Sequence, residues 1–352
     1  MGTIFVWIAK IHKLFKSAII FLYICSILSP ERKFLMNKSL RIIFCVLLAL
    51  FILLALCYVL HSCGVIAKSP VQAEKPATSA SAEPVIEDPA WMELPAPSVM
   101  DESLHVVTHT AQMQGRMQRN YTILYDDDLY AALWVAYPLC ADHTASGREE
   151  SWGYDPQVSK LSQTNVNKGY GASEPTVNYP KNFYARGHQI PNADRSGVPD
   201  MMAQTYYSTN MTPQIQNGFN GNIWAKLEEA VRAEIPQGDT LYVVTGAVFE
   251  KHGVEESVKT IVNKNDSKVL PVPNYYWKAL LKVKRSGTAI TQASTIGFWL
   301  PHGDLKGHSY ADYTVSVDQL EDWTGFNLFP SIPDTLEAVA ESQTTWSSFQ
   351  TF

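Results

Sequence analysis

The chain has 352 residues, of which 46% are hydrophobic and 18% charged, a composition that excludes a disordered or fibrous protein. The formal net charge is −6, and residues 101–352 alone carry 19 basic and 28 acidic residues, a balance of −9. A protein that binds nucleic acid through bulk charge has the opposite sign, so any contact with a polyanion must be local, through a few cations or a metal.

Two apolar runs open the chain. Residues 42–60 form an uninterrupted run, long enough to cross a hydrocarbon core of about 30 Å at ~1.5 Å per residue. Met36 and two basic residues precede this run and are typical of the start of a signal sequence. The earlier run, 4–28, is a poor membrane span because four residues interrupt it, namely Lys10, His12, Lys13 and Lys16. We therefore expect translation to start at Met36 and residues 1–35 to be an over-extended reading frame. The alternative is that both runs are real and form a membrane hairpin.

The segment 36–63 ends at a sequence that resembles a lipoprotein cleavage box, in which a small residue precedes an acylated Cys63. Its apolar core is longer than the roughly 7–15 residues of a cleaved signal, so an uncleaved membrane anchor is the alternative. Because the basic residues precede the span, we expect the C-terminal part to be exported and membrane-tethered, outside the cytoplasm. Residues 64–100 are rich in Pro, Ala and Ser and predict a disordered stalk. Residues 101–346 then form one domain.

Within the domain, residues 120–137 read as a β-hairpin, and residues 141–181 lack any period and predict long surface loops. Apolar residues at every fourth position predict a helix over 222–234. Further strands are expected over 240–246, 274–283 and 289–300, and short helices over 315–324 and 333–340. Hairpins mixed with a few helices favour an α+β fold, with an antiparallel sheet, over a doubly wound parallel one.

Some residues are more easily explained by structure than by chemistry. Cys140 stands alone in the domain, so it forms no internal disulfide, and we interpret it as a buried structural thiol. The lysines of 278–284 alternate along a predicted strand, which favours a solvated face over a weak track for a nucleic-acid backbone.

The chemistry of the chain is carried first by Arg186 and His188. They flank Gly187, so in an extended segment their side chains point to the same side, and the glycine permits a close approach of backbone or phosphate. A neutral imidazole is a suitable general base for water near neutral pH. A guanidinium beside it can donate two parallel hydrogen bonds to a phosphate.

A second group steps by four residues along the predicted helix. It consists of Asn220, Trp224, Glu228 and Arg232, which places the amide and the carboxylate on neighbouring turns of one side. Both offer oxygen ligands, which Mg²⁺ requires, and Mg²⁺ usually keeps several waters. The alternative for Glu228 and Arg232 is a simple helix salt bridge, and we expect Trp224 to pack in the core rather than to stack on a base.

These motifs together resemble the DNA/RNA non-specific endonuclease family. That family has a signature of Asp-Arg-Gly-His, then Asn-x-x-Pro-Gln, then a metal-binding Asn four residues before Trp, then Leu-Glu. The corresponding residues here are Ala185-Arg186-Gly187-His188, Asn210-Met211-Thr212-Pro213-Gln214, Asn220 with Trp224, and Leu227-Glu228. Weaker matches extend the resemblance over about 120–335. It implies a ββα-metal (His-Me finger) fold, a central antiparallel sheet flanked by helices, for the domain 101–346.

The resemblance also implies roles for individual residues. His188 would be the general base, and Asn220 would be the sole direct protein ligand of Mg²⁺, with Mn²⁺ as an alternative ion. Glu228 would orient the water shell of the metal, and Asn210 would help to hold the site. Three residues would contact phosphate and stabilise the transition state, namely Arg148, Arg186 and Arg232. The implied substrates are DNA and RNA, which the protein would contact through their phosphate backbone and without strong sequence preference. The sequence specifies no oligomeric state.

The main departure from the family pattern is Ala185, where the family has Asp. Since the other motif residues are present, we expect a nuclease that retains activity at a reduced rate. The alternative is a surface nucleic-acid-binding protein of the same fold with weak or lost catalysis. Two assignments have simpler alternatives: Arg148 lies beside two glutamates and could be ordinary surface charge, and Asn210 could be a turn residue.

Overall fold

The computed structural model of the chain describes residues 91–96, 102–174 and 183–352. All of the described residues belong to one compact unit, Ile86–Phe352. The expected start at Met36, the apolar runs and the box at Cys63 lie outside the described residues and stay predictions. Among the helices of the described ranges, none has both the length and the apolar character needed to cross a bilayer.

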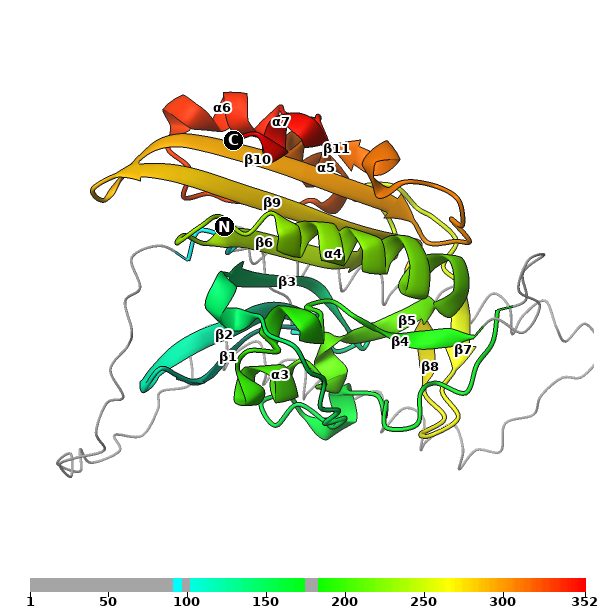
Figure 1. The fold of residues 1–352 in the computed structure, drawn as a ribbon. Helices are drawn as coiled ribbons and strands as arrows, with labels where there is room; N and C mark the ends of the chain where they lie inside the picture. The colour runs from blue at the N-terminus through cyan, green and yellow to red at the C-terminus, as the bar shows by residue number, and fades with distance from the viewer. Residues whose placement is uncertain (1–90, 97–101, 175–182) are drawn as a thin grey trace, which may run out of the picture. The chain divides into compact units, whose positions relative to one another are not determined.

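A seven-stranded sheet forms the centre of the unit, and all its neighbouring strands pair antiparallel. The spatial order is β1-β2-β3-β6-β9-β10-β11 (Figure 1). In that order the strands are Leu104–Met113, Arg116–Asp126, Ala131–Leu139, Leu241–Val248, Tyr275–Ser286, Ala289–Pro301 and Thr314–Val315. Two further antiparallel pairs lie outside this sheet: β4 (Tyr184–His188) with β5 (Met211–Ile215), and β7 (Thr260–Val262) with β8 (Val269–Pro271).

The helices are short. The α-helices are α3 (Pro199–Gln204), α4 (Ala225–Ala233), α5 (Val317–Thr324), α6 (Asp334–Glu341) and α7 (Trp346–Gln350). The segment η5 (Gln216–Trp224) has a kink at Asn217 and Gly218, whose backbone angles are not helical, and its remaining π-helical part leads directly into α4. Single 3₁₀ turns are η1 (Ala141–His143), η2 (Lys160–Ser162), η3 (Asn192–Arg195), η4 (Ser208–Asn210) and η6 (Tyr310–Tyr313). The expected α+β class with a central antiparallel sheet is therefore confirmed.

Each face of the sheet carries its own apolar core. On one face Leu227 and Val231 of α4 pack against Leu280 of β9, and Figure 1 shows α4 lying across this side. On the other face Val317 and Leu320 of α5 pack in a separate cluster. Because alternate residues of a strand point to opposite faces, a central strand must be apolar on both. β6 is buried along its whole length for this reason.

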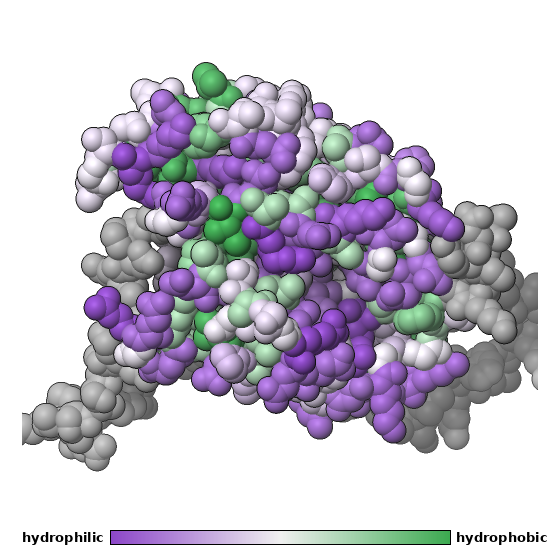
Figure 2. All heavy atoms as spheres, in the orientation of Figure 1, coloured by the Kyte–Doolittle hydropathy of each residue, from purple (hydrophilic) through white to green (hydrophobic). Residues whose placement is uncertain are grey.

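The surface seen from the α4 side is largely polar. Of the described residues on the face shown in Figure 2, most are hydrophilic, and the hydrophobic ones form small separate groups. Scattered groups of this kind are normal on a folded protein and do not mark an interface.

Most elements expected from the sequence are present, but four expectations need correction. The described part of the region 141–181, residues 141–174, is largely irregular, as expected, yet it is not merely a surface loop, because three of its own residues, Asp155, Val166 and Tyr170, are buried. Cys140 is only partly buried, and its Sγ lies 3.4 Å from Nδ1 of His143. β1 was not expected at all. The lysines of 278–284 do not form one solvated face, because Lys278 is fully buried and only Lys284 is exposed.

The limits of the domain also differ from the expected 101–346. Glu93 is fully buried and forms an ion pair with the buried Arg119, whose guanidinium lies 4.6 Å from the centre of the Trp91 ring. Residues 91–96, which the sequence assigned to the stalk over 64–100, therefore pack on the folded domain. At the other end, Phe349 of α7 is fully buried in the α4-side core, so the domain extends past residue 346.

His302 connects three parts of the fold. Its Nε2 accepts a hydrogen bond from the backbone N–H of Ile215, 2.8 Å away, and its Nδ1 donates to the carbonyl of Pro273, also 2.8 Å away. The bond accepted at Nε2 requires the neutral ring, and burial lowers the pKa of His302 to about 4, although the bond to the Pro273 carbonyl acts in the opposite direction. The contact holds the end of β5, where η5 begins.

This pairing predicts a loss of stability in mild acid. The pKa of His302 in the folded chain lies below its ordinary value, so its contribution is present above pH 6.5 and is lost as the pH falls toward 4. A shift of this size corresponds to roughly 3 kcal/mol. We expect the free energy of unfolding, measured with urea at pH 7 and pH 4.5, to fall less in His302→Gln than in the parent chain. An equal fall in both would contradict this role of His302.

Candidate functional site

A cavity of about 740 Å³ opens where β4, η5 and the first turn of α4 meet. Its lining includes five of the residues singled out from the sequence, which are Arg148, Arg186, His188, Asn220 and Glu228. They come from segments up to 80 positions apart in the chain. The fold thus brings the expected base and the expected metal ligand to one cavity.

The pairing of β4 with β5 sets the direction of the side chains at this cavity. Arg186 pairs with Pro213, and His188 pairs with Met211, so the two side chains point to one side as the sequence predicted. Gly187 lies between them, and a Cβ at this position would approach the side chain of Gln214 to 2.3 Å. The motif therefore needs glycine here because a neighbouring side chain fills the space.

His188 lies against two aromatic rings. The ring centres of Trp152 and Tyr206 are 5.5 and 5.3 Å from that of the imidazole. Nε2 of His188 is buried and has no hydrogen-bond partner among the described residues. Burial, and then the charges of Arg148 and Arg186, lower the pKa of His188 to about 3, partly opposed by a hydrogen bond to the Arg186 carbonyl. The imidazole is therefore neutral at physiological pH and has a free nitrogen.

Arg186 is held rigidly. Its guanidinium lies 3.4 Å from the centre of the Trp152 ring, and its Nη1 donates to the carbonyls of Val166 and Asn167 at 3.1 and 3.2 Å. An Arg that stacks and donates in this way loses little further freedom when it binds an anion. The guanidinium therefore has a fixed position in the cavity.

Arg148 is more loosely placed. It forms an exposed ion pair of 3.1 Å with Glu150, and its guanidinium lies 5.8 Å from the centre of the Tyr206 ring. Arg148 therefore has an ordinary surface partner, and it also lines the cavity where the resemblance expects a phosphate contact.

Asn220 lies on the π-helical segment η5. Its Nδ2 donates to Oε1 of Gln216 at 3.0 Å, so Oδ1 is the atom of the amide that can act as a ligand. The segment is possible because Gly218 has a φ of +84°, and a Cβ there would meet Asp304 at 2.0 Å. The backbone angles of Asn217 and Gly218 are not helical, so the chain bends here before it enters the helical turns that carry Asn220 and continue into α4.

Glu228 lines the same cavity one turn into α4. Its pKa is raised to about 7, first by burial, while the charge of Lys278 acts in the opposite direction. Lys278 is buried on β9, donates to Oγ1 of Thr245 at 3.1 Å, and lies 4.6 Å from the centre of the Trp224 ring. Its own pKa is lowered to about 8 by burial. The sequence pattern assigned Lys278 to a solvated face and gave it no role in the site, although a Lys inside an apolar strand is a signal that could have identified it.

Arg232 and Asn210 lie outside the lining of the cavity. Arg232 does not pair with Glu228 as a simple helix salt bridge would require. Instead its Nη1 donates to Oδ1 of the buried Asp194 at 2.9 Å, and Tyr137 donates to the other oxygen of Asp194 at 2.8 Å. Trp224 is buried in the core, as expected.

Asn210 holds the chain that follows His188. Its Oδ1 accepts a bond of 3.0 Å from the N–H of Ile190, and its Nδ2 donates to the carbonyls of Ile190 and Thr205 at 2.9 and 2.7 Å. The residue is fully buried. It therefore acts on the cavity through the backbone rather than by direct contact.

The donor atoms of the cavity suit a hard divalent cation. Asn220 and Glu228 offer an amide and a carboxylate oxygen, and no cysteine lines the cavity within the described ranges. The single group of three His, Cys, Asp or Glu side chains close enough to enclose a metal, among the described residues, is Asp318, Glu321 and Glu341, which lies elsewhere. A cation in the cavity would thus keep most of its water, as Mg²⁺ prefers.

Comparison with known proteins identifies similar chains. A family model described as DNA/RNA non-specific endonuclease matches residues 103–335. The chain is 28% identical over 225 residues to a nuclease of Serratia marcescens, a match that spans 63% of this chain and 77% of the other. It is 25% identical over 232 residues to a nuclease of Nostoc sp., spanning 64% and 77%.

A solved structure of an EndoG/EndoGI complex, described as revealing the mechanism of EndoG inhibition, contains a chain of similar fold. The TM-score is 0.51 at 19% sequence identity, over 64% of this chain and 88% of the other. At this identity the likeness concerns the fold alone.

The surroundings of His188 predict its titration. Because burial and two cations lower its pKa to about 3, we expect the ring to stay neutral at pH 5. NMR of histidine-labelled protein, with His188 assigned from a His188→Gln sample, measures this pKa. Arg148→Gln should raise the pKa by removing a positive charge, whereas Arg116→Gln, at an exposed residue of β2, should leave it unchanged. A ring that titrates near pH 6.5 in the parent chain would refute this description.

Proposed function

Because the chain belongs to the DNA/RNA non-specific endonuclease family and is a nuclease, a phosphodiester hydrolase, we propose that His188 and Asn220 carry its chemistry together with a divalent cation. The observation that carries the proposal is the unpartnered, neutral Nε2 of His188 in the same cavity as Asn220 and Glu228. The substrates are DNA and RNA.

His188 takes the proton from the attacking water at Nε2. In the free protein the charges of Arg148 and Arg186 disfavour protonation of the ring. A bound phosphodiester carries negative charge, which offsets these cations and raises the pKa of His188 toward neutrality. The base thus becomes effective when substrate is present, and a pKa near the working pH is the optimum for proton transfer.

Arg186 and Arg148 bind the phosphate. Arg186 is fixed by its stacking on Trp152 and by two backbone carbonyls, so its donors are already oriented for the charge that develops in the transition state. Lys168 also lines the cavity and is exposed. These three cations supply the local positive charge that an acidic domain needs to bind a polyanion. Arg232, bonded to Asp194, supports α4 from outside the cavity.

Asn220 would hold the cation directly, and Glu228 would orient its water ligands. When bound, Mg²⁺ or Mn²⁺ would act as a Lewis acid on the phosphate and ease departure of the leaving oxygen. Asn210 fixes the backbone after β4 and so keeps the imidazole aimed at the phosphate. Contacts with the phosphate backbone of the nucleic acid, rather than with base edges, give little sequence preference.

Removal of the base or of the cation should abolish cleavage. We expect His188→Ala to lower the rate of plasmid nicking by at least about 10³-fold, since it removes the proton acceptor. EDTA should have a comparable effect on the parent chain, reversed by added Mg²⁺. His308→Ala, a change at an exposed histidine outside the cavity, is the matched control and should leave the rate unchanged.

The same assay separates the nuclease from a binding protein that has lost turnover. Binding of DNA with no cleavage in Mg²⁺ or Mn²⁺ would favour the binding protein and contradict the assignment of His188. Full activity of His188→Ala would contradict it as well.

We expect substitution of Ala185 by Asp to raise the cleavage rate. It lines the cavity next to Arg186, at the position where the family pattern has Asp. A carboxylate there could orient the guanidinium or a metal-bound water, and an oriented polar group of this kind is often worth about 10²-fold in rate. We expect Ala185→Asp to raise the cleavage rate by about tenfold or more, and Ala185→Asn to raise it less. A rate unchanged or lowered in Ala185→Asp, in protein of unchanged melting temperature, would indicate that this chain compensates in another way.

A further inference from the structure

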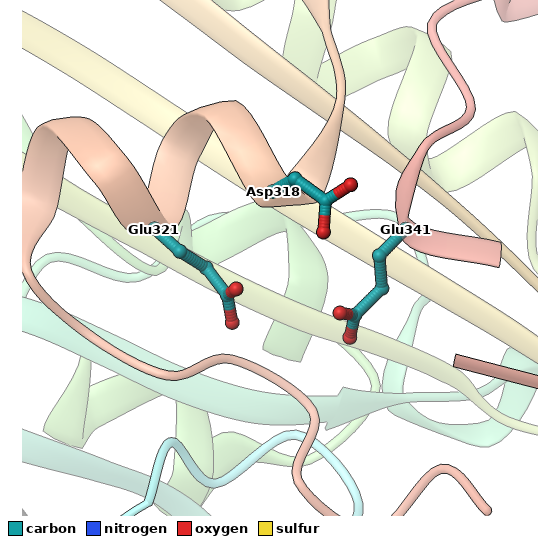
Figure 3. A group of neighbouring side chains, drawn as sticks. All are labelled: Asp318, Glu321 and Glu341. Atoms are coloured by element: carbon teal, nitrogen blue, oxygen red, sulfur yellow. The ribbon is translucent and has the colours of Figure 1, made fainter. Parts of the chain in front are cut away.

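Three carboxylates meet on the face of the sheet opposite to α4. Asp318 and Glu321 lie one turn apart on α5, and Glu341 is the last residue of α6. Figure 3 shows the three side chains directed toward one another. When one carboxylate oxygen is taken from each side chain, these three oxygens all lie within 4.8 Å of one another.

Glu341 is the unusual member of this group. Its exposed fraction is 3%, and its Oε1 is buried without a hydrogen-bond partner among the described residues. Burying a charged carboxylate is costly unless a proton, a cation or a hydrogen-bond network compensates it. An unpartnered oxygen aimed at two further carboxylates needs such compensation.

Among the described residues, no positive charge is paired with this group. Within the described ranges, no ion pair joins any of the three carboxylates to a Lys, Arg or His. Burial, and then the charges of Glu321, Glu337 and Asp318, raise the pKa of Glu341 to about 8. The charged groups identified around Glu341 are therefore all acidic.

The two helices hold these side chains in fixed positions. Val317 and Leu320 anchor α5 in the core, and Oγ1 of Thr295 donates to the carbonyl of Ala340 at 2.7 Å, which fixes the end of α6. Glu321 accepts a bond of 2.6 Å from the N–H of Leu328 on Oε1, so its second oxygen remains available. The arrangement is thus built by packing and does not depend on a mobile loop.

We propose that Asp318, Glu321 and Glu341 form a second cation site, distinct from the nuclease cavity, that binds Ca²⁺. Ca²⁺ takes oxygen ligands at about 2.3–2.6 Å, so two ligands on opposite sides of the ion are about 4.6–5.2 Å apart. The three carboxylate oxygens all lie within 4.8 Å of one another, so one ion of this size can contact all three. Mg²⁺ needs shorter distances and stricter geometry, and it gives up its water reluctantly. Asp318 is exposed, which leaves a route for the ion and positions for water ligands.

The site has a structural role. It joins α5 to α6 across the strand β10, on which both helices pack, and none of its three residues lines the nuclease cavity. A cation bound there would therefore stabilise the folded domain without taking part in phosphodiester hydrolysis.

The test uses the full chain with Asn220→Ala, so that the proposed ligand of the nuclease cavity is absent. After treatment with a chelator, isothermal titration with Ca²⁺ should give one site per chain, and the melting temperature should rise by several degrees at saturation. Asp318→Asn and Glu341→Gln should each weaken Ca²⁺ binding by about tenfold or more, because each removes a charged ligand. Asp322→Asn, at an exposed residue of the same helix, is the matched control and should bind Ca²⁺ normally.

Asp318 is exposed, so its variant keeps the test valid even if Glu341→Gln fails to fold. In the chain with Asn220 intact, the cleavage rate of Asp318→Asn should equal that of the parent. Absence of Ca²⁺ binding, equal binding in all variants, or binding of Mg²⁺ in place of Ca²⁺ would overturn the proposal. The proposal would also be overturned if the parent chain bound no Ca²⁺ and Glu341→Gln were more stable than the parent. That result would identify a shared proton as the compensating charge.

Discussion

The pairing of β4 with β5 is the contact on which the candidate active site depends. One strand carries His188, and the other leads at Ile215 into η5, which carries Asn220. The hydroxyl of Tyr276 joins β5 to the central sheet through Thr212 and the carbonyl of Pro213, at 2.9 and 3.1 Å. The base and the metal ligand are therefore positioned by one short ribbon fixed to a rigid sheet, which is how precise sites are generally held.

Much of this arrangement could be predicted from the sequence. Local patterns carry the information for the extended segment with His188 and for the helix with Glu228, because both depend on residue spacing alone. The convergence of Asn220 with His188 came from the family resemblance, since no local rule brings residues of a strand and a helix to one cavity.

The parts that could not be predicted all depend on burial by distant segments. Arg232 pairs with Asp194, which lies on a turn far away in sequence, and not with its neighbour on the helix. Lys278 is buried because α4 covers its strand, although its spacing alone favours a solvated face. Packing between distant elements determines these partners, so residue spacing along the sequence cannot predict them.

Residues 91–96 belong to the folded domain because two of them contact a buried cation. Glu93 and Trp91 are contacts of a guanidinium that is itself buried, that of Arg119. A chain cut at residue 101 would lose both contacts, and removal of one partner of a buried ion pair typically costs several kcal/mol. A recombinant fragment that begins at Trp91 keeps this ion pair.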